Sequence, residues 1–339
     1  MRTVGPKLPF YAKFTLLLLM ICLIVFILYA GRDIIMPLLI SLLFALLLRP
    51  LVIFFNKKLK FPNVLAVLVV LLLFIVLIGA VIFFISGQFS EFANDLPRIK
   101  QNLSVHYDHL LEWVQQKFHI SYNKQEKYIK QVTEHNGNQL LGSTLTTFSH
   151  SFLHIVLIPI YTFLILLYRN LFKKFLHKLV YKKSHHVLIS IIMEVKIVIQ
   201  SYIVGLLIEM GIIAVLTSCG MMIVGVQYAI LLGVITAVLN LIPYIGILSA
   251  TLMAIVAASI NSTDLSVVLG SVAVNATVHF IDNNFLIPKI VASKVRINAL
   301  ASIIGVITGG LLAGIMGMFL AIPIIAIIKV IFDRISDLE

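Results

Sequence analysis

A run of 54 residues, from Met210 to Thr263, contains no Asp, Glu, Lys or Arg. A bilayer core about 30 Å thick is crossed by about 20 apolar residues of helix, so this run is long enough to enter a membrane twice. Pro243 and Gly246 interrupt its second half. Broken helices are tolerated at membrane depth where they are buried in protein or line a cavity. The run therefore favours a transport function.

The chain as a whole is strongly apolar. Of its 339 residues, 60% are hydrophobic and 12% are charged, and the mean hydropathy is +1.08. No soluble domain can hide that much apolar surface, so we predict an all-α, polytopic helical membrane protein. In such a protein the net charge of +12 indicates cytoplasmic loops and contact with membrane lipids, and not nucleic-acid binding.

About eight apolar segments follow one another along the chain. They are residues 14–31, 34–55, 61–90, 151–168, 197–224, 227–260, 265–287 and 297–328. Four parts are expected: N-terminal transmembrane helices (1–87), an extracytoplasmic amphipathic helical domain (88–148), a transmembrane helix with a basic cytoplasmic linker (149–196) and a C-terminal transport core (197–339). In the second part, apolar residues recur mostly at steps of three or four, as in an amphipathic helix.

Positive charge predicts the orientation, because cytoplasmic loops are enriched in Lys and Arg. The N-terminus, the loop at 56–60, the linker at 169–196 and the C-terminus are expected to be cytoplasmic. If segments 227–260 and 297–328 each crossed once, the basic residues Lys289, Lys294 and Arg296 would lie outside, against the rule.

A second solution treats those two segments as re-entrant hairpins. Both exceed 30 residues, and glycines interrupt the second near Gly309 and Gly314. Each half would measure about 21–24 Å at about 1.5 Å per residue. One hairpin from each side of a single crossing at 265–287 places the basic loop inside. Discontinuous helices that meet near the midplane are typical of transporters, and we carry the hairpin model as a hypothesis.

Ionisable residues are rare in the C-terminal segments. Asn275, His279 and Asp282 share a helix face, and Asn283 follows. A carboxylate in hydrocarbon costs several kcal/mol by default, so this face is a candidate site for an ion, a proton or a substrate. The alternative is that residues 282–284 cap the helix at the interface. Glu209 is either a proton relay or a structural partner of Arg49 or His279.

The interruption at 240–246 supplies further candidates. Asn240 is placed to present its amide to a substrate, and the pathway would include Pro243, Tyr244 and Gly246. The alternative is a kink whose polar groups neighbouring helices satisfy. A series of small residues follows in the last segment: Gly305, Gly309, Gly310 and Gly314. For these glycines, a role in helix packing is favoured over a substrate path.

Enzymatic and cofactor chemistry is not expected. The sequence contains no Walker A motif, nucleophile elbow or HExxH motif, so ATP-driven transport by this chain alone is disfavoured. The paired histidines at 106/109 and 150/154 lack a completing carboxylate or Cys, and no metal site is predicted.

Several of these motifs together resemble the AI-2E family of bacterial membrane transporters, named for export of the signal autoinducer-2. The matching stretches are Arg49-Pro50-Leu51, Leu231-Leu232-Gly233, Asn240 to Gly246, Asp282 to Ile290, and Gly309 to Pro323. The chain departs from the family pattern at Leu206, Ile247, Ala250, Ala292, Asn298 and Ala299. The resemblance implies a multi-pass secondary transporter of the bacterial cell membrane that forms homo-oligomers.

Three functions remain open at this point. The first is export of a small polar solute by alternating access. The second is antiport of Na⁺ or K⁺ against protons, for which Glu209 and Asp282 are the deep candidate acids. The third is a non-transporting membrane scaffold built around the 88–148 domain.

Overall fold

The computed structural model describes residues 9–95, 98, 102, 112, 115–117, 144–180, 185–242, 245–259, 265–291 and 297–335. Over these ranges the elements are helices, without a β-strand. The predicted all-α class is therefore confirmed. Most of the 88–148 domain and both residues Pro243 and Tyr244 lie outside the described residues.

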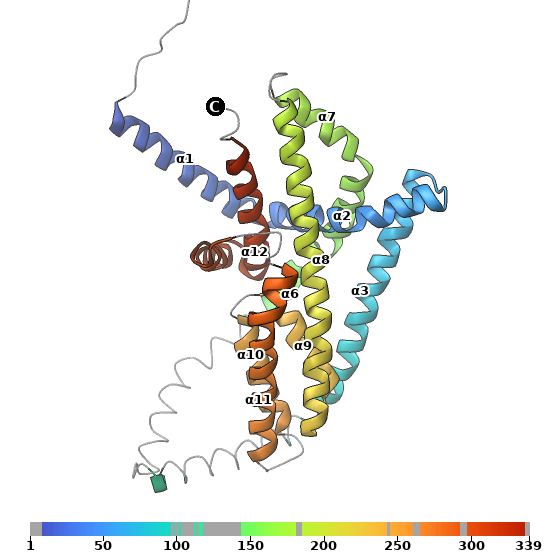
Figure 1. Ribbon diagram of the computed structural model, residues 1–339, viewed down its shortest axis with the longest axis vertical. Helices are drawn as coiled ribbons and strands as arrows, with labels where there is room; N and C mark the ends of the chain where they lie inside the picture. Colours follow the sequence, from blue (N-terminus) through green and yellow to red (C-terminus); the bar gives the residue numbers. More distant parts are fainter. Residues whose placement is uncertain are drawn as a thin grey trace, which may run out of the picture.

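The helices follow the predicted apolar segments closely (Figure 1). They are α1 (Phe10–Ala30), α2 (Arg32–Lys58), α3 (Asn63–Asn94), α6 (Thr144–Leu167), α7 (Arg169–Leu179), α8 (His185–Val224), α9 (Ala229–Leu239), α10 (Ile245–Ala258), α11 (Leu265–Ile281), the π-helix η2 (Asp282–Val291) and α12 (Ala299–Ile335). In the described ranges, α1, α2, α3, α8 and α12 are long and apolar enough to cross a membrane, and α6 with α7 forms a bent sixth candidate. The predicted number of about eight segments is not confirmed.

Helix α8 runs along the long direction of the molecule (Figure 1). Its 40 residues span about 60 Å at about 1.5 Å per residue, roughly twice a bilayer core. It begins at His185, well before the predicted start near residue 197. The charged residues Glu194 and Lys196 set the apolar boundary near Ile197, but both are good helix formers, so the helix continues through them.

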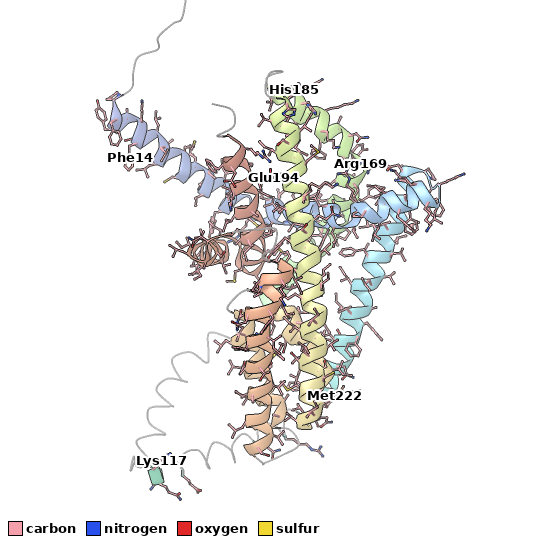
Figure 2. All side chains as sticks on the ribbon, in the orientation of Figure 1. Phe14, Lys117, Arg169, His185, Glu194 and Met222 are labelled. Atoms are coloured by element: carbon pink, nitrogen blue, oxygen red, sulfur yellow. The ribbon has the colours of Figure 1, made fainter. Side chains whose placement is uncertain are left out.

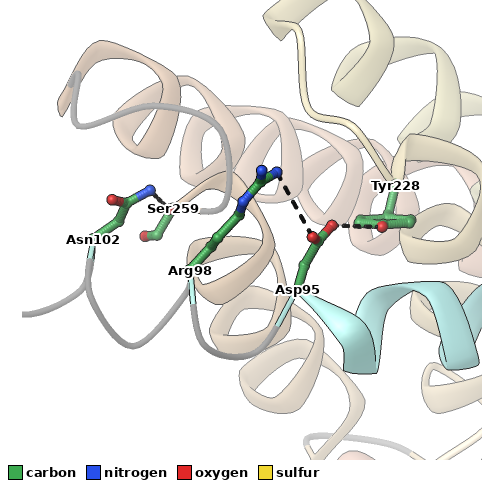
Figure 3. A network of polar contacts seen from close by, with 5 residues as sticks. All are labelled: Asp95, Arg98, Asn102, Tyr228 and Ser259. Carbon is green, nitrogen blue, oxygen red and sulfur yellow. Dashed lines mark hydrogen bonds and ion pairs between the residues drawn. The ribbon is translucent and has the colours of Figure 1, made fainter.

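Helices α9 and α10 form a hairpin whose two ends meet the end of α3. The Tyr228 hydroxyl, just before α9, donates to Asp95 Oδ2 at 2.8 Å. The Asn102 amide donates to the carbonyl of Ser259, just after α10, at 2.9 Å (Figure 3). With 11 and 14 residues, the two helices are about 16 and 21 Å long. Each is therefore too short to cross a bilayer core alone.

Helix α12 also folds back on itself. Ala313 and Gly314 have non-helical backbone angles, and the φ of +59° at Gly314 lies in the region that favours glycine. Across this break, Gly309 lies against the backbone of Gly317, and Gly305 lies against Ile325. In both pairs, one residue precedes the break and the other follows it at a similar distance along the chain. This pairing defines two antiparallel helices in close contact. Glycine permits that approach because it has no Cβ.

The first hairpin is bonded to the end of α3, toward the end of α8 (Figure 1). Helix α12 ends beside the start of α8, where Arg334 Nε pairs with Glu194 Oε2 at 2.7 Å. Residues next to both tips, Leu241 and Ala313, pack on one hydrophobic cluster that includes Tyr202 of α8. Two helical hairpins with neighbouring tips are therefore present, and their re-entry into a membrane from opposite sides stays a prediction.

Replacing Tyr228 by Phe should weaken the attachment of the first hairpin. The ring packs edge-on against Phe92 at 5.6 Å, and Phe keeps this contact but loses the bond to Asp95. We expect a loss of about 1 kcal/mol in the free energy of unfolding, read as a lower Tm in detergent. Tyr11→Phe is the control, since Tyr11 is 73% exposed. Equal Tm values for the two variants would show that the bond contributes nothing.

Candidate functional site

Three polar side chains from three helical elements meet near the middle of α8. Asn240, at the tip of the first hairpin, donates its amide to Glu209 Oε1 at 3.2 Å and to Asp282 Oδ2 at 3.1 Å. Glu209 lies on α8, and Asp282 is the first residue of η2. Both carboxyl groups are buried, with 4% and 2% of each residue exposed. We call Glu209 and Asp282 the acid pair.

The acid pair must hold a proton or a cation. Both carboxyl groups accept from the same Asn240 amide nitrogen, so they lie close together. Two ionised carboxylates at this separation would repel each other strongly in a buried environment. The pair is therefore suited to take up and release a single positive charge.

Further buried polar atoms lie on the elements that form the pair. Within the described residues, Asp282 Oδ1, Asn275 Oδ1, both His279 ring nitrogens and Thr217 Oγ1 have no hydrogen-bond partner. Leaving a buried polar atom unpaired costs about 1–3 kcal/mol, and native structures rarely contain many such atoms. These unpaired atoms are candidates to bind a polar ligand, an ion or water.

Local structure places Asp282 inside a helix, and not at its end. The chain continues from α11 into the π-helix η2 as far as Val291. Pro288 lies within η2, and π-helical turns occur frequently at functional sites. The alternative in which residues 282–284 cap the helix is therefore wrong, because Asp282 is the first of the ten residues of η2.

Two glycines allow the elements to come together. A Cβ on Gly205 of α8 would lie 2.9 Å from the carbonyl oxygen of Ile290, so Gly205 lets η2 lie against α8. A Cβ on Gly246 would overlap the carbonyl of Leu239 and the backbone nitrogen of Asn240. Gly246 thus makes the tip of the first hairpin possible and holds Asn240 in place by backbone packing.

The predicted pathway residues have different positions in the structure. Asn240, Glu209 and Asp282 come together, and Asn275 and His279 are buried on α11. Asn283 is exposed and is not part of this group. The side chains of Pro243 and Tyr244, and those of the four paired histidines, lie outside the described residues.

One alternative for Glu209 needs correction. Its hydrogen-bond partner is Asn240, so the alternative in which it pairs with Arg49 or His279 is wrong. Arg49 Nε is buried without a partner, as are both ring nitrogens of His279. Sequence reasoning also missed Thr217, whose only signal was a hydroxyl two turns after Glu209 in an apolar helix.

Of the glycines predicted for packing, Gly305, Gly309 and Gly310 each lie against the second half of α12. Gly314 has no such neighbour and forms the break. Among the described residues, no group of three or more His, Cys, Asp or Glu side chains is placed to hold a metal ion.

The chain is similar to known families and proteins described as transporters. Residues 15–337 match the model of the family described as AI-2E family transporter. "Putative transport protein YueF" of Bacillus subtilis is 25% identical over 314 residues, which covers 89% of this chain and 84% of that protein. "Putative transport protein YrrI" of the same organism is 27% identical, covering 88% and 86%. "Putative transport protein YhhT" of Escherichia coli K12 is 22% identical, covering 89% and 85%.

Proposed function

Because this chain belongs to the AI-2E transporter family, we propose that it is a secondary transporter that exports a small polar solute by alternating access. The observation that carries the proposal is the acid pair, held by one amide at the tip of a broken helix. Buried ionisable residues in membrane segments typically mark ion and substrate pathways. Broken helices near the midplane typically form the binding sites of secondary transporters.

Asn240 links the charge of the acid pair to the position of the first hairpin. It lies on the first hairpin, whereas its two acceptors lie on α8 and η2. Any displacement of the hairpin tip breaks both bonds. Conversely, a change in the charge of the acid pair changes how strongly it holds the amide. Protonation and the position of the hairpin are therefore coupled.

The two hairpins supply the two gates. The first hairpin is bonded at the end of α3, α12 ends beside the start of α8, and residues near both tips share one hydrophobic cluster. Movement of one hairpin would open a route from one side while the other stays closed. We place the protein in the bacterial plasma membrane with both termini in the cytoplasm, on the basis of the basic residues at 57–60, 173–178 and 329–334.

Flux in proteoliposomes tests this proposal. Purified protein is reconstituted in vesicles loaded with autoinducer-2, and release is followed with and without an imposed proton gradient. We expect release that depends on the gradient and exceeds that of protein-free vesicles. Absence of any flux of autoinducer-2, Na⁺ or K⁺ from protein with an intact thermal transition would favour the scaffold function instead.

A cation/proton antiporter is the second candidate, and the charge of the site favours it. Within the described residues, no Lys or Arg bonds to the acid pair, and Asp282 Oδ1 has no donor. Carboxylate and amide oxygens are hard ligands, which suit a hard cation that replaces a proton at the pair. In this case Na⁺ or K⁺ added outside vesicles would change the internal pH without any organic solute.

Cysteine labelling tests the orientation. In a Cys22→Ser/Cys219→Ser background, we expect Lys294→Cys to react with an impermeant maleimide only from the cytoplasmic side. Ser266→Cys, at the start of α11, should react only from the outside. Labelling of position 294 from the outside alone would contradict the arrangement with one hairpin from each side.

A further inference from the structure

Helix α7 has an apolar face that the rest of the protein leaves open. Its apolar residues fall on one side at helical spacing, and its basic residues fall on the other. Leu171, Phe172 and Phe175 are 64%, 53% and 58% exposed. The opposite face carries Lys173, Lys174, His177 and Lys178. Helices with this pattern lie in membrane interfaces, with the apolar face buried at the headgroup boundary.

The position of α7 fits an interfacial helix. It leaves the end of α6 at an angle of 68°. The end of α6 is anchored among the other helices, because Leu166 shares a core cluster with Leu48 of α2. A bilayer that surrounds α6 would therefore end near Arg169, where α7 turns away (Figure 2).

Two arginines lie near this bend without an acidic partner in the described residues. Arg49 directly follows Leu48, which shares a core cluster with Leu166, three residues before Arg169, so both arginines lie at the same end of α6. Arg49 Nε is buried without a hydrogen-bond partner. Within the described part of the chain, neither arginine forms an ion pair. Guanidinium groups at the same end of a helix, one of them with an unpaired donor, are suited to bind phosphate oxygens.

We propose that Arg49, Arg169 and α7 form a binding site for an anionic phospholipid of the cytoplasmic leaflet. The phosphate accepts hydrogen bonds from the two guanidinium groups. Lys173 and Lys174 attract the negative surface around the bound lipid. The acyl chains lie against Leu171, Phe172 and Phe175.

The apolar face decides between a lipid and a soluble phosphate. A free phosphate ion would use the arginines but would leave the exposed side chains of α7 in water. A phospholipid covers both at once, and burial of apolar area contributes about 25 cal/mol per Å². The site is separate from the acid pair, so its test needs no transport measurement.

Thermal stability of the purified protein in detergent tests the site. Phosphatidylglycerol, phosphatidylcholine and inorganic phosphate are added in separate titrations. We expect phosphatidylglycerol to raise the Tm at roughly tenfold lower concentration than phosphatidylcholine, and inorganic phosphate to have no effect. In Arg169→Gln the preference for phosphatidylglycerol should be lost, whereas Arg32→Gln, at the start of α2, should retain it.

The variant Arg169→Lys tests whether the loss of preference in Arg169→Gln is caused by misfolding. It keeps the charge but loses the two-point hydrogen bonding of guanidinium, so it should show an intermediate preference for phosphatidylglycerol. Equal responses to phosphatidylglycerol and phosphatidylcholine in the unmodified protein would overturn the proposal. An equal response to inorganic phosphate would overturn it as well, because it would identify a simple anion site. Loss of the preference in Arg32→Gln would show that only overall charge matters.

Discussion

Asp282→Asn is expected to reduce gradient-driven flux to the level of protein-free vesicles while the protein stays folded. The change preserves the size of the side chain and leaves an oxygen that can accept from Asn240. It removes the titratable group that lies beside Glu209 on the same Asn240 amide. The remaining carboxyl then has no partner of like charge, so the pair can no longer exchange one positive charge per cycle. Initial flux rates in proteoliposomes measure the effect.

The control for this prediction is the neighbouring residue. Asn283→Ala changes a polar side chain that is exposed, and it should leave flux within about twofold of the unmodified protein. Glu209→Gln should reproduce the loss seen in Asp282→Asn, because either change breaks the same pair. Wild-type flux in Asp282→Asn would mean that the pair has a structural role only.

Gly309→Ala is expected to prevent the second hairpin from closing. A Cβ at this position would overlap the carbonyl of Gly317, which is backbone and cannot turn aside. Inserting a group into such a contact costs about 1–3 kcal/mol or more, since both helices must separate along their length. We expect a Tm lower by several degrees or aggregation on size-exclusion chromatography, and a comparable effect from Gly317→Ala.

Gly211→Ala is the matched control for the hairpin. Gly211 lies within α8, and a Cβ there would meet nothing within 4 Å. In an open helical position Ala is favoured over Gly by up to about 1 kcal/mol, so the Tm should stay the same or rise. Similar stability in Gly309→Ala and Gly211→Ala would show that the two halves of α12 do not pack together.

The hairpins could be predicted because their signals are local. Segments 227–260 and 297–328 are too long for one crossing and contain Pro or Gly at their centres. The charge rule then disfavoured two simple crossings. The buried face of Asn275, His279 and Asp282 followed from helical spacing alone. These features depend on residues close to one another in the sequence, so no knowledge of packing was needed.

The acid pair could not be predicted as a pair. Glu209 and Asp282 were both visible as lone carboxylates in apolar sequence, but which partner each meets depends on how α8, the first hairpin and η2 pack. The bridging role of Asn240 depends on the same packing. For the same reason spacing could not exclude a pairing of Glu209 with Arg49. The structure places Arg49 elsewhere, next to the cluster that holds Leu48 and Leu166.

The central claim is that the acid pair couples solute movement to protons. Its most direct test is the internal pH of proteoliposomes that contain a pH-sensitive dye, recorded while autoinducer-2 or Na⁺ is added outside. The account predicts a pH change with the unmodified protein and none with Asp282→Asn. A solute flux in the unmodified protein that proceeds without any change in internal pH, and at the same rate in Asp282→Asn, would contradict it.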